Sequence, residues 1–112
     1  ELLILCYKRY YVNNGKIIKN IKKIKTFLQL NLNKYTNNID NKSIYSLISY
    51  TVHLGSGTNS GHYVNIRKIN NNKWMVFDDN KILEIDTEKI DTSCAYYMIY
   101  EKWDNQKRKG DN

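Results

Sequence analysis

The chain has 112 residues, a length typical of one domain, and its hydrophobic fraction of 41% is that of a globular protein rather than a disordered one. Its formal net charge of +7 suggests, taken alone, a nucleic-acid partner. The basic residues are spread along the chain, however, and the two denser runs (16–25 and 107–109) are typical of an amphipathic segment and a polar tail. We therefore expect no nucleic acid as a partner, and no membrane either, since no apolar run is long enough to span a bilayer.

Cysteine and histidine are scarce in this sequence. The two cysteines, Cys6 and Cys94, form no CxxC pair, and there are only two histidines, so we expect no disulfide framework, no metal site and no cofactor. Cys6 lies inside an apolar run and is expected to be a buried structural residue. The composition is typical of a reducing, intracellular setting, in the cytoplasm or nucleus. Because the chain opens with Glu1 rather than methionine, we expect it to be a fragment of a longer protein.

The first half of the chain predicts strands joined by a tight turn. Residues 2–12 are rich in aliphatic and tyrosine residues and predict one strand. Asn13-Asn14-Gly15 predicts a hairpin turn, because Asn-Gly adopts the positive φ angles that such turns need. Residues 16–30 fit both a helical and an alternating pattern, and a strand is favoured because a hairpin turn precedes them. A polar, Asn-rich connection follows over residues 31–43.

The second half predicts a unit rich in β-structure. A loop of small residues spans 55–61, a turn spans 70–72, and one capped helical turn is expected at 87–90. The expected strands are 45–54, 62–69, 73–78, 81–85 and 95–103. Residues 104–112 are polar and predict a disordered tail. Residues 1–103 are thus expected to form one domain of mostly antiparallel β-structure, with no internal repeat.

A histidine and an aspartate are expected to meet across one predicted hairpin. If the turn centres on Asn71, positions that sum to 142 face each other, as 64 and 78 do, so Val64 faces Asp78. Side chains alternate between the two faces, which places His62 diagonally from Asp78 on one face, within reach of a hydrogen bond. A carboxylate on one imidazole nitrogen fixes the tautomer and leaves the other nitrogen free to act on a nucleophile. From this pattern alone the site is weak, because a surface histidine beside an Asp-Asp turn is the commoner arrangement.

The wider pattern resembles the histidine box of the ubiquitin-specific proteases. The family's motifs are Tyr-x-Leu, His-x-Gly, Gly-His-Tyr, Trp-x-x-Phe-Asp-Asp and Ala-Tyr-x-Leu-x-Tyr, in that order. The matching residues here are Tyr45-Ser46-Leu47, His53-Leu54-Gly55, Gly61-His62-Tyr63, Trp74-Met75-Val76-Phe77-Asp78-Asp79 and Ala95-Tyr96-Tyr97-Met98-Ile99-Tyr100. Residues 3–10 also resemble an upstream Lys-Arg-Phe strand of the family, with Tyr10 in place of Phe. The resemblance covers most of the chain and favours strands over residues 16–32.

The resemblance implies roles for individual residues. His62 is similar to the general base that activates a cysteine thiol, Asp78 to the acid that orients this base, and Asp79 to a second, supporting acid. The positions similar to those that line the channel for ubiquitin's C-terminal tail are His53, Gly61 and Tyr63. The loop 55–61 resembles a flexible loop that lies over that tail in the family.

The resemblance also implies a fold and an activity. The fold is the C-terminal half of a papain-like cysteine protease, of the α+β class and mostly antiparallel β. The activity is thiol-dependent hydrolysis of the peptide or isopeptide bond that follows ubiquitin. The family's nucleophile and oxyanion donors lie in an upstream cysteine box that Cys6 and Cys94 do not match, so we expect the chain alone to be inactive. Expected partners are ubiquitin, ubiquitinated proteins and the upstream half of the same domain, which would cover an exposed apolar face.

Two other functions fit parts of the pattern. A catalytically dead ubiquitin-binding module would have no nucleophile anywhere, but it would have little need to keep both His62 and Asp78. A basic nucleic-acid-binding β domain would carry its aromatic residues on an exposed face beside its lysines, and its affinity would depend on salt.

Overall fold

The computed structural model describes residues 1–37, 43–55 and 61–103. The strands within these ranges are β1 (Leu2–Cys6), β2 (Tyr10–Asn13), β3 (Lys16–Lys19), β4 (Gln29–Asn31), β5 (Ile44–Leu54), β6 (His62–Lys68), β7 (Lys73–Asp78), β8 (Lys81–Asp86) and β9 (Ala95–Lys102). The same ranges contain two short 3-10 helices, η1 (Asn33–Tyr35) and η2 (Thr87–Lys89), and no α-helix. The expected antiparallel β-structure is confirmed, whereas the α part of the expected α+β class is not found in the ranges described. The expected tail and the middle of the small-residue loop lie outside them.

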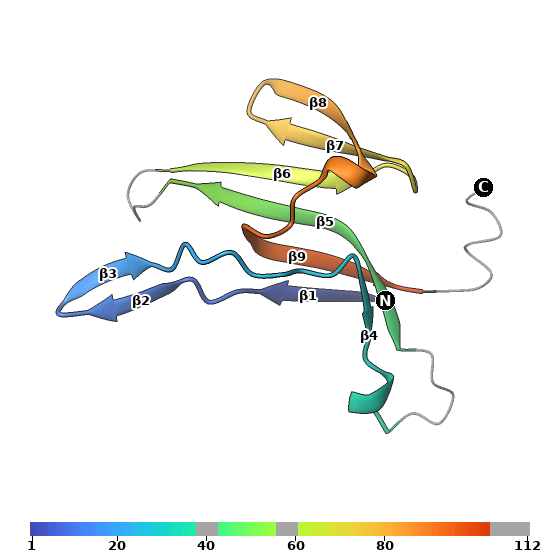
Figure 1. The fold of residues 1–112 in the computed structure, drawn as a ribbon, viewed down its shortest axis with the longest axis horizontal. Helices are drawn as coiled ribbons and strands as arrows, with labels where there is room; N and C mark the ends of the chain where they lie inside the picture. Colours follow the sequence, from blue (N-terminus) through green and yellow to red (C-terminus); the bar gives the residue numbers. More distant parts are fainter. Residues whose placement is uncertain (38–42, 56–60, 104–112) are drawn as a thin grey trace.

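One antiparallel sheet carries most of the structure (Figure 1). Its strands lie in the order β1-β9-β5-β6-β7-β8, and β4 pairs with the beginning of β5. Strands β2 and β3 form a separate hairpin beside the sheet. The last strand, β9, therefore lies between the first strand and β5, which joins the two halves of the chain into one sheet. No helix in the described part of the chain is long and apolar enough to cross a membrane.

The hairpin of β2 and β3 has the predicted turn. Asn13 pairs with Lys16, so the turn consists of Asn14 and Gly15, which have φ angles of 51° and 75°. Two consecutive positive φ angles define the tight turn that matches the twist of the strands, and Asn-Gly is the dipeptide that adopts it with least strain. The turn chemistry of the sequence thus fixes the register of this hairpin.

Two predicted strands are interrupted in the structure, and both interruptions involve Arg9. The expected strand 2–12 divides into β1 and β2, and the expected strand over 16–30 is wrong for residues 20–28, which lie between β3 and β4. The Arg9 side chain is buried and donates hydrogen bonds to the carbonyls of Asn20, Lys22, Ser93 and Ala95. The guanidinium thus binds carbonyls of the segment 20–28 and of the segment that leads into β9, which holds the two segments together where residues 20–28 form no strand.

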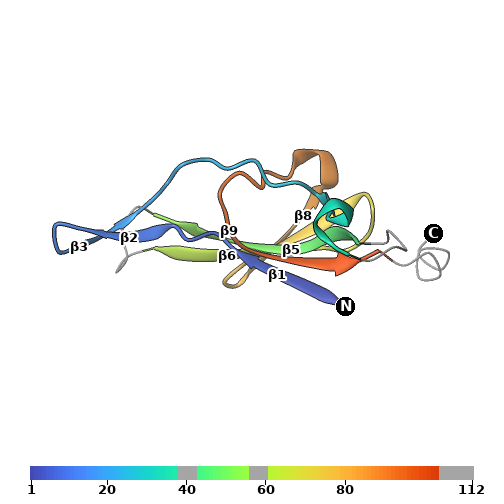
Figure 2. The same cartoon turned by 90° about the horizontal axis from the view of Figure 1, so that it is seen from below.

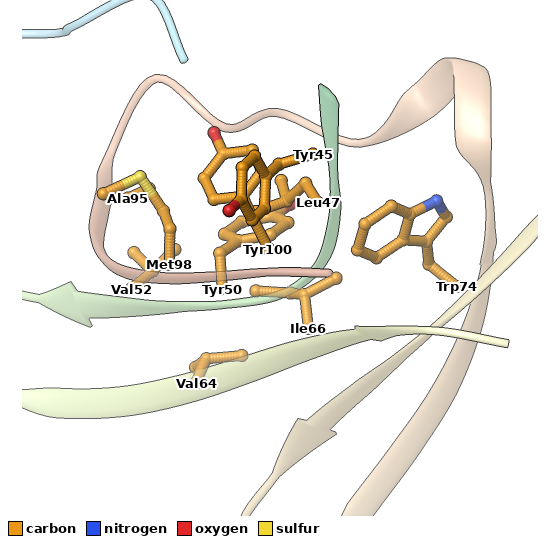
Figure 3. Close-up of a cluster of buried hydrophobic side chains, with 10 residues drawn as sticks. All are labelled: Tyr45, Leu47, Tyr50, Val52, Val64, Ile66, Trp74, Ala95, Met98 and Tyr100. Carbon is orange, nitrogen blue, oxygen red and sulfur yellow. The ribbon is translucent and has the colours of Figure 1, made fainter. Parts of the chain in front are cut away.

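The hydrophobic core lies on one face of the sheet. Its buried side chains come from β5, β6, β7 and β9 and are Tyr45, Leu47, Tyr50, Val52, Val64, Ile66, Trp74, Ala95, Met98 and Tyr100 (Figure 3). The segment between β3 and β4 and the connection between β8 and β9 pass over this face (Figure 2). Tyr100 donates to the carbonyl of Phe27 at 2.8 Å, and Thr92 donates to that of Thr26 at 2.8 Å, which ties the two covering segments to the sheet and to each other.

The opposite face of the sheet is open. One row of mutually paired residues runs across six strands on this face and consists of Cys6, Tyr97, Thr51, Asn65, Phe77 and Ile82. Leu2 and Ile4 of β1 lie on the same side and are also exposed. The expectation that Cys6 is buried is wrong, because its position in β1 points it away from the core. The open face thus carries exposed apolar side chains next to one another.

The helical turn expected at 87–90 is present as η2, without the expected side-chain cap. Asp86, which precedes it, makes no capping hydrogen bond. Its carboxylate instead binds the ammonium of Lys73, with Nζ and Oδ1 2.6 Å apart. Thr87 donates from its hydroxyl to the carbonyl of Asn71 at 2.9 Å. Both polar groups are used to join η2 to the turn between β6 and β7, so neither is available as a cap.

Candidate active site

The hairpin of β6 and β7 has the register expected from the sequence. Ile66 pairs with Val76 and Lys68 with Trp74, so facing positions sum to 142. His62 at the start of β6 and Asp78 at the end of β7 therefore lie diagonally on the core face of the sheet. They stand at the end of the sheet where the apolar core stops, with both side chains between a third and two-fifths exposed.

His62 and Asp78 are hydrogen-bonded to each other. Nε2 of His62 contacts Oδ1 of Asp78, which is the contact that the sequence predicted. The hydrogen bond to the carboxylate, and then its negative charge, raise the pKa of His62 above the ordinary value of 6.5. With Nε2 held by Asp78, the tautomer is fixed and Nδ1 is the nitrogen that remains to exchange a proton with another group.

Asp79 lies beside the second nitrogen of the same ring. Its Oδ2 is 3.6 Å from Nδ1 of His62, and its side chain is largely exposed. Asp79 has a φ of 50°, since it and Asn80 form the tight turn between Asp78 and Lys81. Aspartate tolerates this left-handed conformation, so the Asp-Asp pair both makes the turn and brings two carboxylates to one imidazole.

An open depression surrounds this group and is lined by His62, Asp78, Asp79, Asn80 and Lys81. The ligand atoms of the histidine and the two aspartates lie within 4.8 Å of one another, a spacing that a cation could bridge. Exposed acidic groups commonly come this close without a metal, and acid–base chemistry uses the same arrangement. The absence of a metal from the site stays a prediction.

Two other expected site residues, His53 and Tyr63, lie on the opposite face of the sheet. His53 of β5 pairs with Tyr63 of β6, and their rings are 4.6 Å apart between centroids. Tyr63 is exposed, whereas His53 is only 8% exposed. A side chain built on Gly61 would collide with the His53 ring, which explains why glycine stands before His62. The structure thus brings His53, Gly61 and Tyr63 together next to His62. His53 is covered by other side chains, whereas a residue that lines an open channel was expected.

Two residues that the sequence pattern did not point to cover His53. Nδ1 of His53 lies 3.0 Å from the hydroxyl of Tyr10 and 3.0 Å from Nζ of Lys19, both on the β2–β3 hairpin. Burial, and then the charge of Lys19, lower the pKa of His53 below its ordinary value. The sequence held part of the information that points to Tyr10 and Lys19, because the turn predicted at Asn14 and Gly15 places positions 10 and 19 opposite each other.

Comparison with known proteins identifies the family. The family described as "Ubiquitin carboxyl-terminal hydrolase" matches this chain over residues 1–100. The chain belongs to the ubiquitin carboxyl-terminal hydrolase family. This is a family of cysteine peptidases, and the matched region is part of its catalytic domain.

Curated relatives of the ubiquitin carboxyl-terminal hydrolase family align over most of this chain. A probable ubiquitin carboxyl-terminal hydrolase 16 of Schizosaccharomyces pombe is 29% identical over 102 residues, which are 91% of this chain and 22% of the relative. Ubiquitin carboxyl-terminal hydrolase 10 of Arabidopsis thaliana is 33% identical over 109 residues, which are 91% of this chain and 11% of the relative. The chain thus spans less than a quarter of the curated relatives it matches here.

Solved structures of the family share the fold. The Ubp8 chain of a SAGA DUB module bound to monoubiquitin matches with a TM-score of 0.79 and 30% identity, covering 92% of this chain and 23% of that chain. A module of the same subunits bound to ubiquitin aldehyde matches with a TM-score of 0.79 and 28% identity. Members of this family with the same fold therefore bind ubiquitin.

Proposed function

We propose that this chain supplies the general base and its orienting acid to a thiol-dependent deubiquitinase. The enzyme would hydrolyse the isopeptide or peptide bond after the C-terminal glycine of ubiquitin. The observation that carries the proposal is the hydrogen bond between His62 and Asp78, at the end of a sheet that belongs to a deubiquitinase catalytic domain. A purely binding surface has no use for an imidazole whose tautomer is fixed by a carboxylate.

In this proposal His62 moves the protons of the reaction. Its Nδ1 takes the proton of a cysteine thiol, and the thiolate attacks the carbonyl carbon of ubiquitin's terminal glycine. The imidazolium then gives the proton to the leaving lysine amine as the C–N bond breaks. A water molecule, deprotonated by the same nitrogen, hydrolyses the thioester and restores the thiol. Asp78 stabilises the imidazolium in both halves of the cycle, and Asp79 adds negative charge beside Nδ1.

The nucleophile of this mechanism comes from outside the present chain. Cys6 lies on β1, which is separated from β6 by β9 and β5. With adjacent strands about 4.8 Å apart, it is roughly 14 Å from the strand of His62, too far for proton transfer. Cys94 precedes β9, two strands away from β6. The upstream half of the catalytic domain is therefore proposed to bring the cysteine and the oxyanion donors, and the present chain alone is expected to be inactive.

The same proposal accounts for the open apolar face and for the missing helical part. The upstream half would complete a papain-like fold of the α+β class by packing on the uncovered side of the sheet. Ubiquitin and ubiquitinated proteins are the proposed partners, and the exposed Tyr63 beside Gly61 is the proposed contact for ubiquitin's tail. Both cysteines are free, which suits a reducing intracellular compartment.

The test uses the natural full-length protein and ubiquitin that carries a thiol-reactive group at its C-terminus. The expected result is a covalent adduct, seen by mass spectrometry, whose rate of formation falls by about a hundredfold or more in His62→Ala. Glu88→Gln, a change at an exposed acid on η2, is the control and should react like the wild type. Ubiquitin binding without an adduct would instead favour the catalytically dead ubiquitin-binding module. Salt-dependent binding to nucleic acid, with no affinity for ubiquitin, would favour the basic β domain.

A further inference from the structure

Lys19 of the β2–β3 hairpin joins that hairpin to the end of β5. Its ammonium lies 2.7 Å from the carbonyl oxygen of His53, 2.7 Å from that of Gly55 and 3.0 Å from Nδ1 of the His53 ring. An ammonium has three N–H donors, and each of these three acceptors can take one. A lysine at an exposed strand end normally stays in solvent, so a fully used ammonium is a specific contact rather than a surface charge.

The contact with Lys19 fixes the state of the His53 ring. Because a protonated ammonium can only donate, Nδ1 of His53 must accept, and the single ring proton lies on Nε2. The hydroxyl of Tyr10 lies 3.0 Å from the same Nδ1, whose single lone pair accepts from one of these two donors at a time, and the Tyr63 ring packs against the imidazole. His53 is thus held as a neutral ring in one orientation, by two residues of the hairpin and one residue of β6.

The edge of the His53 ring that carries Nε2 and Cε1 lies directly against Gly61. A Cβ atom on Gly61 would be 2.6 Å from Cε1 of His53 and 2.8 Å from the carbonyl oxygen of Leu54, both too short for any real contact. The Gly61 backbone therefore lies close to this edge of the His53 ring, with no room for a side chain between them. Gly61 is followed directly by His62, so the position of the ring limits where the backbone of His62 can lie.

We propose that Lys19 is a positioning residue, which holds His53 and, through the Gly61 backbone, fixes the point from which the His62 imidazole projects. The inference rests on the proposed function, because it assigns Lys19 a role in the same reaction. It assigns the glycine at position 61 and the histidine at position 53 to the support of His62, where the sequence had suggested contacts with ubiquitin's tail. Lys19 itself touches neither His62 nor the reacting atoms.

The test measures kcat and KM for the full-length protein on ubiquitin that carries a fluorogenic leaving group at its C-terminal glycine. In Lys19→Met, which keeps the length of the side chain but no donor, kcat should fall by about tenfold while KM changes by less than about twofold. Lys19→Arg keeps the charge and the donors and should recover most of kcat. Lys16→Met, at the exposed start of the same strand, removes the same charge and should match the wild type.

A second readout separates a failure of this inference from a failure of the proposed function. NMR of the ring nitrogens should show His53 with its proton on Nε2, and Lys19→Met should shift the backbone amide signals of Gly61 and His62, whereas Lys16→Met should not. If the wild type does not cleave ubiquitin, the proposed function fails and these amide shifts decide whether Lys19 positions His62.

Three results would overturn the inference. The first is a Lys19→Met variant whose kcat equals that of the wild type. The second is a variant in which only KM rises, which would make Lys19 a contact for ubiquitin rather than a support for His62. The third is a set of Gly61 and His62 amide signals that do not change. If Lys19→Met is unfolded at the assay temperature, Lys19→Gln, whose uncharged side chain is shorter by one atom and cannot reach all three acceptors, replaces it with the same expected split between kcat and KM.

Discussion

Replacing Arg9 by methionine should loosen the segment that covers the core. Arg9 is 4% exposed, and its guanidinium donates two buried hydrogen bonds to the carbonyl of Ala95, at 3.1 and 2.9 Å. It also donates to Asn20, Lys22 and Ser93, whose carbonyls are only partly buried and can bind water after the change. Hydrogen bonds to a charged group contribute about 1.5–3 kcal/mol each, against a desolvation cost of several kcal/mol for the buried charge. The net loss in the free energy of unfolding should therefore be about 2–4 kcal/mol.

This loss is large for a domain whose whole stability is about 5–15 kcal/mol, and urea denaturation followed by circular dichroism measures it. Hydrogen exchange supplies a local readout, because the Ile24 amide donates to the carbonyl of Ser93 at 2.9 Å in the region that Arg9 holds. This amide should exchange faster in Arg9→Met than the amides of the central strands do. Lys8→Met, at the exposed neighbour, removes the same charge without any of these bonds and is the matched control.

Equal free energies of unfolding for Arg9→Met and Lys8→Met, within about 0.5 kcal/mol, would refute this role of Arg9. Equal exchange rates at Ile24 in the two variants would refute the local part of it. Arg9→Lys should lie between them, because lysine keeps the charge but cannot reach several carbonyls with one planar group.

The remaining predictions concern the two histidines, one buried hydroxyl and the open face. In an NMR titration of the chain, the midpoint of His62 should lie above 6.5 and fall in Asp78→Asn, whereas the midpoint of His53 should lie below 6.5. The raised pKa means that the folded state favours the charged form of His62. The stability that His62 contributes is therefore fully present below pH 6.5 and is lost as the pH rises through its raised pKa. Equal midpoints for His53 and His62 would contradict these opposite shifts. Tyr100→Phe removes a partly buried 2.8 Å hydrogen bond and should cost about 1–2 kcal/mol in urea denaturation, more than Tyr45→Phe, whose hydroxyl binds the side chain of Glu1. The isolated chain should bind a hydrophobic dye through its open face, and a monomeric, folded chain that binds none would count against a missing covering half.

Local chemistry in the sequence determined the hairpins and the candidate catalytic pair. The Asn14-Gly15 turn and the alternation along β6 and β7 depend only on neighbouring residues, so their registers follow from the sequence. Because one register places His62 diagonally from Asp78, their hydrogen bond could be predicted before the structure was known. The proposed catalytic roles of these two residues come from the family resemblance, because the geometry of the pair alone is weak evidence for catalysis.

Contacts between distant segments were decided only by the tertiary structure. Arg9 binds carbonyls more than 80 residues away, at the point where one predicted strand divides into β1 and β2. Lys19 reaches His53 across 34 residues, and Cys6 is exposed because its side of β1 lies on the open face of the sheet. Periodicity shows which side of a strand a residue occupies. It carries no information about which distant carbonyl a long cationic side chain will meet, or which face of the sheet a later segment will cover.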